Sequence, residues 1–330
     1  MDISTLLYAP FLGQPAWLWL SFLALVAALL AFDLGVLHRK QREIPVSESL
    51  LLSAGYIAMG LAYRAWIWSH LGAASAMDYF TGYLVEKSLS MDNVFVIAMI
   101  FSYLAIPRAL QHRVLFWGIL GVIVMRAIMI GLGATLVSQF SWVLYIFGAF
   151  LLLTGVKMLF TSSQPMDLAS NRMLQWLRRR IRVTDSLHGD RFFVRQADTQ
   201  GTLRRYATPL FLALVMIETA DLIFAVDSVP AIFVITQDPF IVYTSNIFAV
   251  LGLRALYFAL SAMIDRFQYL KYALALVLVF IGSKIFLVDI VGKLPAWVSL
   301  SVTVGLIAGG VVFSWLKTRK SVPKLADASR

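Results

Sequence analysis

The 330-residue sequence contains no cysteine, and only 14% of its residues are charged. The absence of cysteine excludes disulfides, thiolate metal sites and cysteine nucleophiles. Ordinary globular domains are about 25% charged and about 45–50% apolar, whereas this chain is 60% hydrophobic, with a mean hydropathy of +0.80. A water-soluble fold could not bury so much apolar surface, so the composition predicts a membrane protein.

Apolar segments long enough to cross a bilayer recur along the whole chain. An α-helix needs about 20 apolar residues to do so. We therefore expect an all-α, polytopic membrane bundle of about nine transmembrane helices in a single integral membrane domain, 1–330. The expected spans are 16–37, 49–70, 75–104, 114–136, 140–160, 208–236, 241–263, 270–290 and 296–316.

Arginine and lysine are unevenly distributed among the connections between these spans. If the amino terminus is outside, the inward connections carry Arg39, Lys40, Arg108, Arg113 and the arginine-rich segment 161–206. The positive-inside rule then predicts an outer amino terminus and a cytoplasmic carboxyl terminus in a bacterial inner membrane. The same distribution explains the net charge of +10. We therefore favour membrane topology and contact with anionic lipids over nucleic-acid binding, for which no motif is present.

Two stretches on the third and sixth expected spans share one pattern. They are Glu86-Lys-Ser-Leu-Ser-Met-Asp92-Asn-Val and Asp221-Leu-Ile-Phe-Ala-Val-Asp227-Ser-Val. In the same order, Arg126 corresponds to Arg254, and Gly155-Val-Lys157 corresponds to Gly282-Ser-Lys284. Each copy has an odd number of spans, which predicts a 3+3 inverted repeat, about 75–160 and 208–290, with helices 16–37, 49–70 and 296–316 at its periphery. Transporters with this architecture hold their site between the repeats, near the bilayer midplane.

Ionisable side chains occur inside the expected spans, where they are costly and usually face a cavity. The acids on the third and sixth spans are Glu86, Asp92, Glu218, Asp221 and Asp227. Basic residues that would balance their charge are Lys87, Arg126, Arg254 and Lys284. The alternative interpretation is that these acids and bases pair with each other only to stabilise the bundle.

The spacing of the acids limits how one helix could bind an ion. Glu86 and Asp92 are six residues apart, which leaves them about 120° apart around a straight helix. Pro230 predicts local unwinding after Asp227, which would bring both acids of that helix and backbone carbonyls to one cavity. Neutral oxygens would complete the site, from Asn93 and Ser228. An oxygen-only site of this kind suits a hard divalent cation such as Mg²⁺, Ca²⁺ or Mn²⁺.

Four stretches carry long and specific motifs. They are Glu86-Lys-Ser-Leu-Ser-Met-Asp92-Asn-Val-Phe-Val, Phe147-Gly-Ala-Phe-Leu-Leu-Leu-Thr-Gly-Val-Lys157, Glu218-Thr-Ala-Asp221-Leu-Ile-Phe-Ala-Val-Asp227-Ser-Val-Pro and Thr244-Ser-Asn-Ile-Phe-Ala-Val-Leu-Gly-Leu-Arg254. They resemble the TerC family of integral membrane proteins, most closely its Alx-type members. The resemblance implies a LysE-superfamily helical fold, manganese efflux from the bacterial cytoplasm, and an acidic set of Glu86, Asp92, Glu218, Asp221 and Asp227.

We expect a secondary exporter of Mn²⁺, with no permanently bound cofactor and no enzymatic activity. No GxxxxGK[ST] nucleotide-binding loop is present, so protonatable acids are the available coupling device and protons the expected counter-ion. A membrane scaffold or stress-response partner without transport is one alternative, and an intramembrane protease with Asp92 and Asp227 as its catalytic pair is another. Asp33 either lines the inner mouth of the pathway or pairs with a basic neighbour at the membrane interface.

Overall fold

The computed structural model describes residues 7–33, 46–160, 175, 180–184, 186–197, 202–260, 270–291 and 295–319. The helices there are α2 (Ala16–Phe32), α3 (Val46–Tyr103), α4 (Arg108–Gln139), α5 (Val143–Phe160), α7 (Pro209–Ile235), α8 (Pro239–Leu251), α9 (Leu253–Leu260), α10 (Leu270–Val291) and α11 (Ala296–Arg319). Two antiparallel hairpins accompany them. These are β1–β2 (Pro10–Phe11 and Gln14–Pro15) and β3–β4 (Phe193–Ala197 and Leu203–Ala207).

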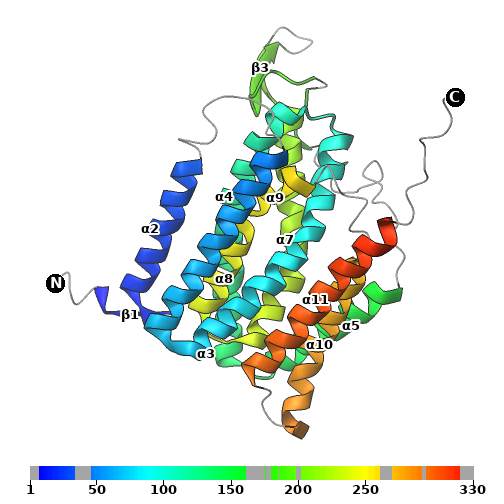
Figure 1. The fold of residues 1–330 in the computed structure, drawn as a ribbon. Helices are drawn as coiled ribbons and strands as arrows, with labels where there is room; N and C mark the ends of the chain where they lie inside the picture. The colour runs from blue at the N-terminus through cyan, green and yellow to red at the C-terminus, as the bar shows by residue number, and fades with distance from the viewer. Residues whose placement is uncertain are drawn as a thin grey trace, which may run out of the picture.

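The long helices lie side by side in one bundle (Figure 1). In the described part of the chain, six helical segments are long and apolar enough to cross a membrane. The chain is therefore a helical membrane protein, as its composition predicts. The strand β1 lies at one end of the bundle, and β3 projects from the opposite end, which we name the hairpin end.

Two glycines divide the helices, one between two expected spans and the other within an expected span. The expected spans 49–70 and 75–104 form one element, α3, whose two parts run in opposite directions (Figure 1). Gly72 makes this reversal with a φ of 89°, a backbone conformation that L side chains rarely adopt. The expected span 241–263 is divided at Gly252 into α8 and α9, and 261–263 lie outside the described residues.

The predicted unwinding of the sixth span is wrong. Helix α7 runs unbroken from Pro209 to Ile235, with Pro230 inside it. The residues around the proline, Val229 to Phe233, are all buried, so packing keeps this segment helical although Pro230 cannot donate a backbone hydrogen bond. Because the helix is regular, Asp221 and Asp227 stay about 120° apart around its axis.

Helices α5 and α10 pack backbone against backbone. A Cβ added at Gly155 on α5 would lie 2.8 Å from the carbonyl oxygen of Ala275 on α10. A Cβ added at Gly282 on α10 would lie 2.7 Å from the carbonyl oxygen of Gly148 on α5. The missing side chains therefore allow the two helices to approach closely, as small residues do at helix contacts in membranes.

Helix α8 is the innermost element, because every residue from Phe240 to Leu251 is buried. Aromatic rings join it to its neighbours: Phe248 of α8, Phe22 of α2 and Tyr63 of α3 have ring centroids 4.7–5.8 Å apart. These contacts hold α2 against the bundle, so that Asp33 at its carboxyl end reaches Arg254 on α9.

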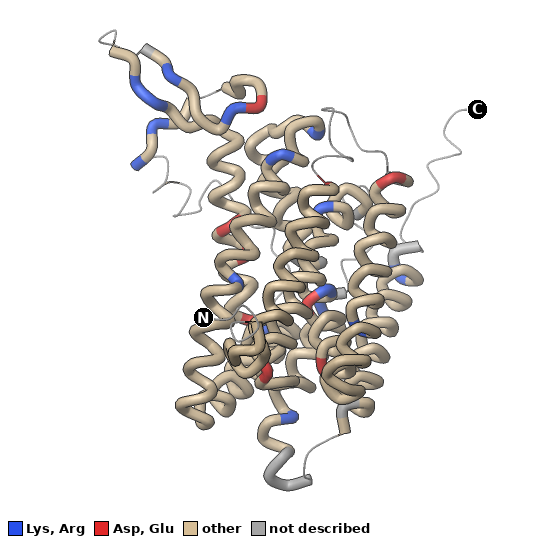
Figure 2. The backbone as a smooth tube through the Cα atoms, turned by 90° about the vertical axis from the view of Figure 1, so that its left-hand side faces the viewer, with Lys and Arg blue, Asp and Glu red and all other residues tan. Residues whose placement is uncertain are grey.

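The β3–β4 hairpin in the segment 161–206 was not predicted. Along β4, exposed and partly buried residues alternate, the period of a strand with one covered face. Phe193 on β3 packs against Phe211 at the start of α7, with 4.5 Å between ring centroids, and the Arg205 guanidinium lies over the Phe193 ring at 4.2 Å. Figure 2 shows that basic residues gather on this hairpin.

Candidate cation site

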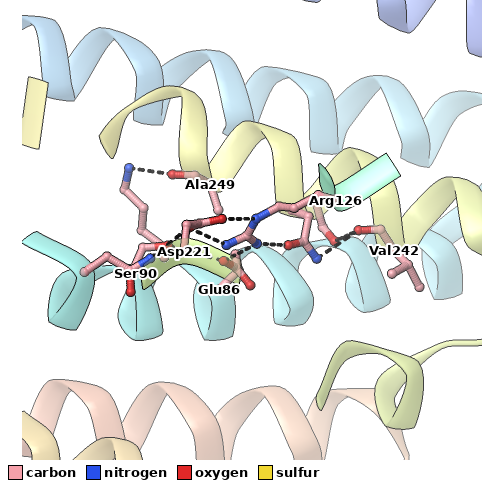
Figure 3. Close-up of polar contacts among 10 residues, drawn as sticks. Glu86, Ser90, Arg126, Asp221, Val242 and Ala249 are labelled. Atoms are coloured by element: carbon pink, nitrogen blue, oxygen red, sulfur yellow. Dashed lines mark hydrogen bonds and ion pairs between the residues drawn. The ribbon is translucent and has the colours of Figure 1, made fainter. Parts of the chain in front are cut away.

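Arg126 on α4 is the centre of a buried polar network (Figure 3). Its guanidinium donates hydrogen bonds to Glu86 on α3, to Asp221 on α7 and to Asn246 on α8. The bonds to Asp221 measure 3.2 Å from Nη2 and 3.4 Å from Nε. Arg126 and Glu86 are each 1% exposed, so four helices meet around ion pairs that are buried inside the bundle.

The network lies deep within the helices that carry it. At 1.5 Å per residue, Glu86 lies about 21 Å along α3 from Gly72, where that helix reverses direction. Asp221 lies about 18 Å along α7 from Pro209, where that helix begins. The hydrocarbon core of a bilayer is about 30 Å thick, so both carboxyl groups lie at membrane depth.

A cavity of about 70 Å³, which we name the main cavity, adjoins this network. It is lined by Glu86, Leu89, Ser90, Asn93, Arg126, Met158, Phe224, Asp227, Ser228 and Leu278. Three buried oxygens have no hydrogen-bond partner in the described part of the chain: Glu86 Oε2, Asn93 Oδ1 and Ser228 Oγ. Buried polar atoms are nearly always hydrogen-bonded, so unpartnered oxygens on residues around one cavity indicate a place for a cation or water.

A smaller cavity of about 30 Å³, the side cavity, is lined by Asn93, Asp221 and Arg254 among apolar residues. Asn93 lines both cavities, and its Nδ2 donates to Asp221 Oδ1 at 3.0 Å. Arg254 forms a buried ion pair with Asp33. A line of polar residues therefore connects the main cavity to the end of α2, and Asp33 has a basic partner in a distant helix.

The structure does not bring the five predicted acids to one point. Glu86 and Asp227 line the main cavity, and Asp221 is bonded to Arg126 and Asn93. Glu218 lies against Gly121 on α4, and the side chain of Asp92 lies outside the described residues. Among the described side chains, no three His, Cys, Asp or Glu residues form a metal-binding group. A cation here would use the two cavity carboxylates and the neutral oxygens of Ser90, Asn93 and Ser228.

The four predicted charge-balancing residues also have different surroundings. Arg126 binds two of the acids, whereas Arg254 pairs with Asp33. Lys87 donates to the carbonyl oxygen of Ala249 at 3.1 Å (Figure 3), because one residue along a helix turns its side chain about 100° away from Glu86. Lys284 interacts electrostatically with Asp78 on α3. Within the described residues, only Arg126 of the four lines the main cavity.

Two members of the network were not predicted from the sequence. Asn246 accepts a hydrogen bond from Arg126 and donates to the carbonyl oxygen of Val242 at 3.3 Å. Ser90 donates to Glu86 Oε1 at 3.3 Å. Both had a signal in the sequence: Asn246 is an amide within an apolar span, and Ser90 follows Glu86 by one helical turn, so the two share a face.

The fold and the buried ionic network define a polytopic helical membrane protein with a polar site at membrane depth. The model of the family described as integral membrane protein TerC matches residues 71–322. The chain belongs to the TerC family, as its motifs predict.

Relatives in other bacteria match over nearly their whole length. An uncharacterized membrane protein of Myxococcus xanthus is 45% identical over 321 residues, covering 97% of this chain and 98% of that protein. A protein of Escherichia coli strain K12, named for a role as a membrane-bound redox modulator, Alx, is 46% identical over 317 residues, covering 93% of this chain and 97% of that protein. No solved structure matches the chain.

Proposed function

We propose that the protein is a secondary transporter that exports Mn²⁺ from the bacterial cytoplasm. The main cavity carries this proposal. Its lining combines two carboxyl groups, from Glu86 and Asp227, with unpartnered oxygens of Asn93 and Ser228, around a space of about 70 Å³ at membrane depth. A space of this size accommodates a cation with some of its hydration water.

The charge of the site favours a divalent cation. When ionised, the network has three negative charges, on Glu86, Asp221 and Asp227, and one positive charge, on Arg126, which leaves a net charge of −2. An uncompensated charge is costly in a medium of low dielectric constant. One divalent cation would neutralise these groups, whereas an anion would add to their repulsion.

The donor atoms favour a hard ion. Carboxylate, amide and hydroxyl oxygens suit Mg²⁺, Ca²⁺ and Mn²⁺, whereas softer metals prefer thiolate or imidazole ligands. The resemblance to Alx-type members favours Mn²⁺ among these three. The relative in E. coli is named for redox modulation, but these 330 residues contain no cysteine, so their own side chains cannot perform thiol–disulfide exchange.

The contact between α5 and α10 supports the inverted repeat. The correspondence that relates Gly155 to Gly282 also relates Gly148 to Ala275. The contact of Gly155 with Ala275 and that of Gly282 with Gly148 are therefore reciprocal. Two copies of one unit related by an axis in the membrane plane produce such a reciprocal contact, as in transporters that alternate access around a central site.

The proposal includes an orientation of the protein in the membrane. Basic residues gather at the hairpin end (Figure 2), which the positive-inside rule assigns to the cytoplasm. The amino terminus is then outside and the carboxyl terminus inside. A reporter enzyme that is active only outside the cytoplasm should be inactive when fused after Lys320, and activity there would contradict this orientation.

The experiment that tests the function measures Mn²⁺ flux through the full-length protein in liposomes, with Mg²⁺, Ca²⁺ and Zn²⁺ as competitors. Asp227→Asn keeps the size of the side chain but removes an anionic ligand, so we expect Mn²⁺ affinity to fall at least about 100-fold. Asp190→Asn, the same change at the hairpin end, should preserve transport. Normal binding by folded Asp227→Asn protein would contradict the site. A wild-type protein that moves none of these ions would contradict transport and favour a scaffold.

A further inference from the structure

Glu218 on α7 lies in a slot on the surface of α4. A Cβ added at Gly121 would stand 2.4 Å from Oε1 of Glu218 and 2.6 Å from its Oε2. The carboxyl group therefore occupies the space that any side chain at position 121 would fill. One turn earlier on α4, a Cβ at Gly118 would keep an ordinary van der Waals distance of 3.6 Å from Oε1.

Both carboxyl oxygens of Glu218 are buried, and neither has a hydrogen-bond partner in the described part of the chain. Glu86 and Asp221, by contrast, both accept hydrogen bonds from Arg126. A buried carboxylate without a donor or a cation is strongly unfavourable, whereas the neutral acid is tolerated. Glu218 therefore holds a proton in the conformation that the structure shows.

The charged groups around Glu218 favour the neutral form. Asp221, one turn further along α7, acts on Glu218 electrostatically, and a second acid so near disfavours a negative charge on Glu218. Arg126 on α4 directs its guanidinium to that aspartate and to Glu86 on α3. The other ionisable groups of α4 lie in its first two turns, at least about 12 Å along the axis from Gly121: Arg108, His112 and Arg113.

Glu218 is separate from the residues that would bind the metal. It does not line the main cavity, whose carboxyl groups belong to Glu86 and Asp227. Asp221, which lies one helical turn from Glu218, is held by Arg126 and Asn93. The geometry therefore does not support the prediction that Glu218 is a metal ligand. It leaves a protonated carboxyl group at the contact of α4 with α7, the helix that also carries Asp227.

We propose that Glu218 is the proton-binding site that couples Mn²⁺ export to proton entry; this rests on the function proposed above. Sliding of α7 against α4 withdraws the carboxyl group from the slot at Gly121 and exposes it to water on the cytoplasmic side. There it releases its proton to water. The carboxylate takes up a proton from water on the outer side before it returns to the slot, so each cycle moves a proton inward as the metal moves outward.

The test uses full-length protein in liposomes that contain a trapped pH indicator and a Mn²⁺ gradient. For the wild type, Mn²⁺ flux should drive an opposing proton flux. Glu218→Gln resembles the protonated acid but cannot release a proton. We expect it to bind Mn²⁺ within about twofold of the wild type, because the two sites share no ligand. It should exchange Mn²⁺ for Mn²⁺ across the membrane, and its proton flux should be lost.

Infrared spectroscopy supplies a measurement that does not depend on transport. The absorption band of a protonated carboxyl group should be present in the wild type and absent in Glu218→Gln. Gly121→Ala places a methyl group in the slot and should shift the pH at which this band disappears. Gly131→Ala is the matched control on the same helix, because a Cβ there meets no atom within 4 Å, and it should behave as the wild type does.

Two results would overturn the proposal while Mn²⁺ transport stands. One is proton flux of wild-type size in Glu218→Gln. The other is a loss of Mn²⁺ binding in Glu218→Gln as severe as that in Asp227→Asn, which would make Glu218 a metal ligand. A wild-type protein without Mn²⁺ flux would overturn the proposed function and, with it, the proposed coupling of Mn²⁺ export to proton entry.

Discussion

Arg126 on α4 binds both oxygens of Asp221 on α7, with Nη2 at 3.2 Å from Oδ1 and Nε at 3.4 Å from Oδ2. The same guanidinium also holds Glu86 on α3. These two acids occupy the same position in the predicted repeats, so one arginine joins the two halves of the molecule at membrane depth. Only a planar group with several fixed donors can bind two carboxylates and the amide of Asn246 at once.

We therefore predict that Arg126→Gln destabilises the protein by about 3–5 kcal/mol, because it leaves Glu86 and Asp221 buried without their cation. Arg126→Lys keeps the positive charge but lacks the planar guanidinium with its several fixed donors, so it should recover only part of the lost stability. Thermal unfolding in detergent measures both changes. Wild-type stability of Arg126→Gln would show that the two acids are neutral in the folded protein.

The affinity of the main cavity for Mn²⁺ should rise with pH. Metal ligation requires deprotonated carboxylates, so protons compete with the metal for Glu86 and Asp227. Affinity should be lowest where these groups are protonated, and it should rise by at most about tenfold per pH unit for each proton that binding displaces. Equilibrium binding of Mn²⁺ to detergent-solubilised protein at a series of pH values measures this slope. Asp227→Asn should flatten it, and an affinity independent of pH in the wild type would contradict carboxylate ligation.

That the chain is a helical membrane protein could be predicted from the sequence, because its apolar segments have about the length that a helix needs to cross a bilayer. The boundary between the expected spans 49–70 and 75–104 was also predicted, and the structure places it at Gly72. The division of the expected span 241–263 at Gly252 was not, because a glycine within an apolar segment is equally compatible with a continuous helix. The β3–β4 hairpin was not predicted either. Its strands are only five residues long, and the arginines within them favoured a topological interpretation of the whole segment.

The sequence identified the helices that carry the candidate site, but it did not identify which residues pair with each other there. Ionisable side chains are costly in contact with lipid, so Glu86, Asp221 and Arg126 are expected to face the interior of the bundle. In the structure Arg126 forms ion pairs with both acids. The sequence pattern also equates Arg254 with Arg126, yet Arg254 pairs with Asp33 from a helix outside the repeats. A repeat in sequence fixes corresponding positions, but the helices added around it decide which acid each arginine meets.

The contact between α5 and α10 should tolerate no side chain at Gly282. A methyl group there would lie 2.7 Å from the carbonyl oxygen of Gly148 and 2.9 Å from the backbone nitrogen of Leu152. Backbone atoms cannot move aside as a flexible side chain can, so Gly282→Ala should cost about 1–3 kcal/mol of stability. Gly305→Ala on α11 is the control, because a Cβ there meets no atom within 4 Å. Equal stability of the two variants, measured by thermal unfolding, would show that α5 and α10 are not in backbone contact.

The ion pair between Asp33 on α2 and Arg254 on α9 should couple the first helix to the bundle. Both side chains are buried, at 3% and 6% exposure, so Asp33→Asn alone or Arg254→Gln alone leaves one buried charge without this partner and should cost about 3–5 kcal/mol. The double variant removes both charges together, and we expect it to be more stable than the sum of the single effects predicts. Thermal unfolding of all four proteins gives the coupling free energy. Because Arg254 also lines the side cavity beside Asn93 and Asp221, Mn²⁺ flux should fall in the single variants and partly recover in the double variant. Strictly additive effects would mean that the two residues act independently and that α2 is held by its aromatic contacts alone.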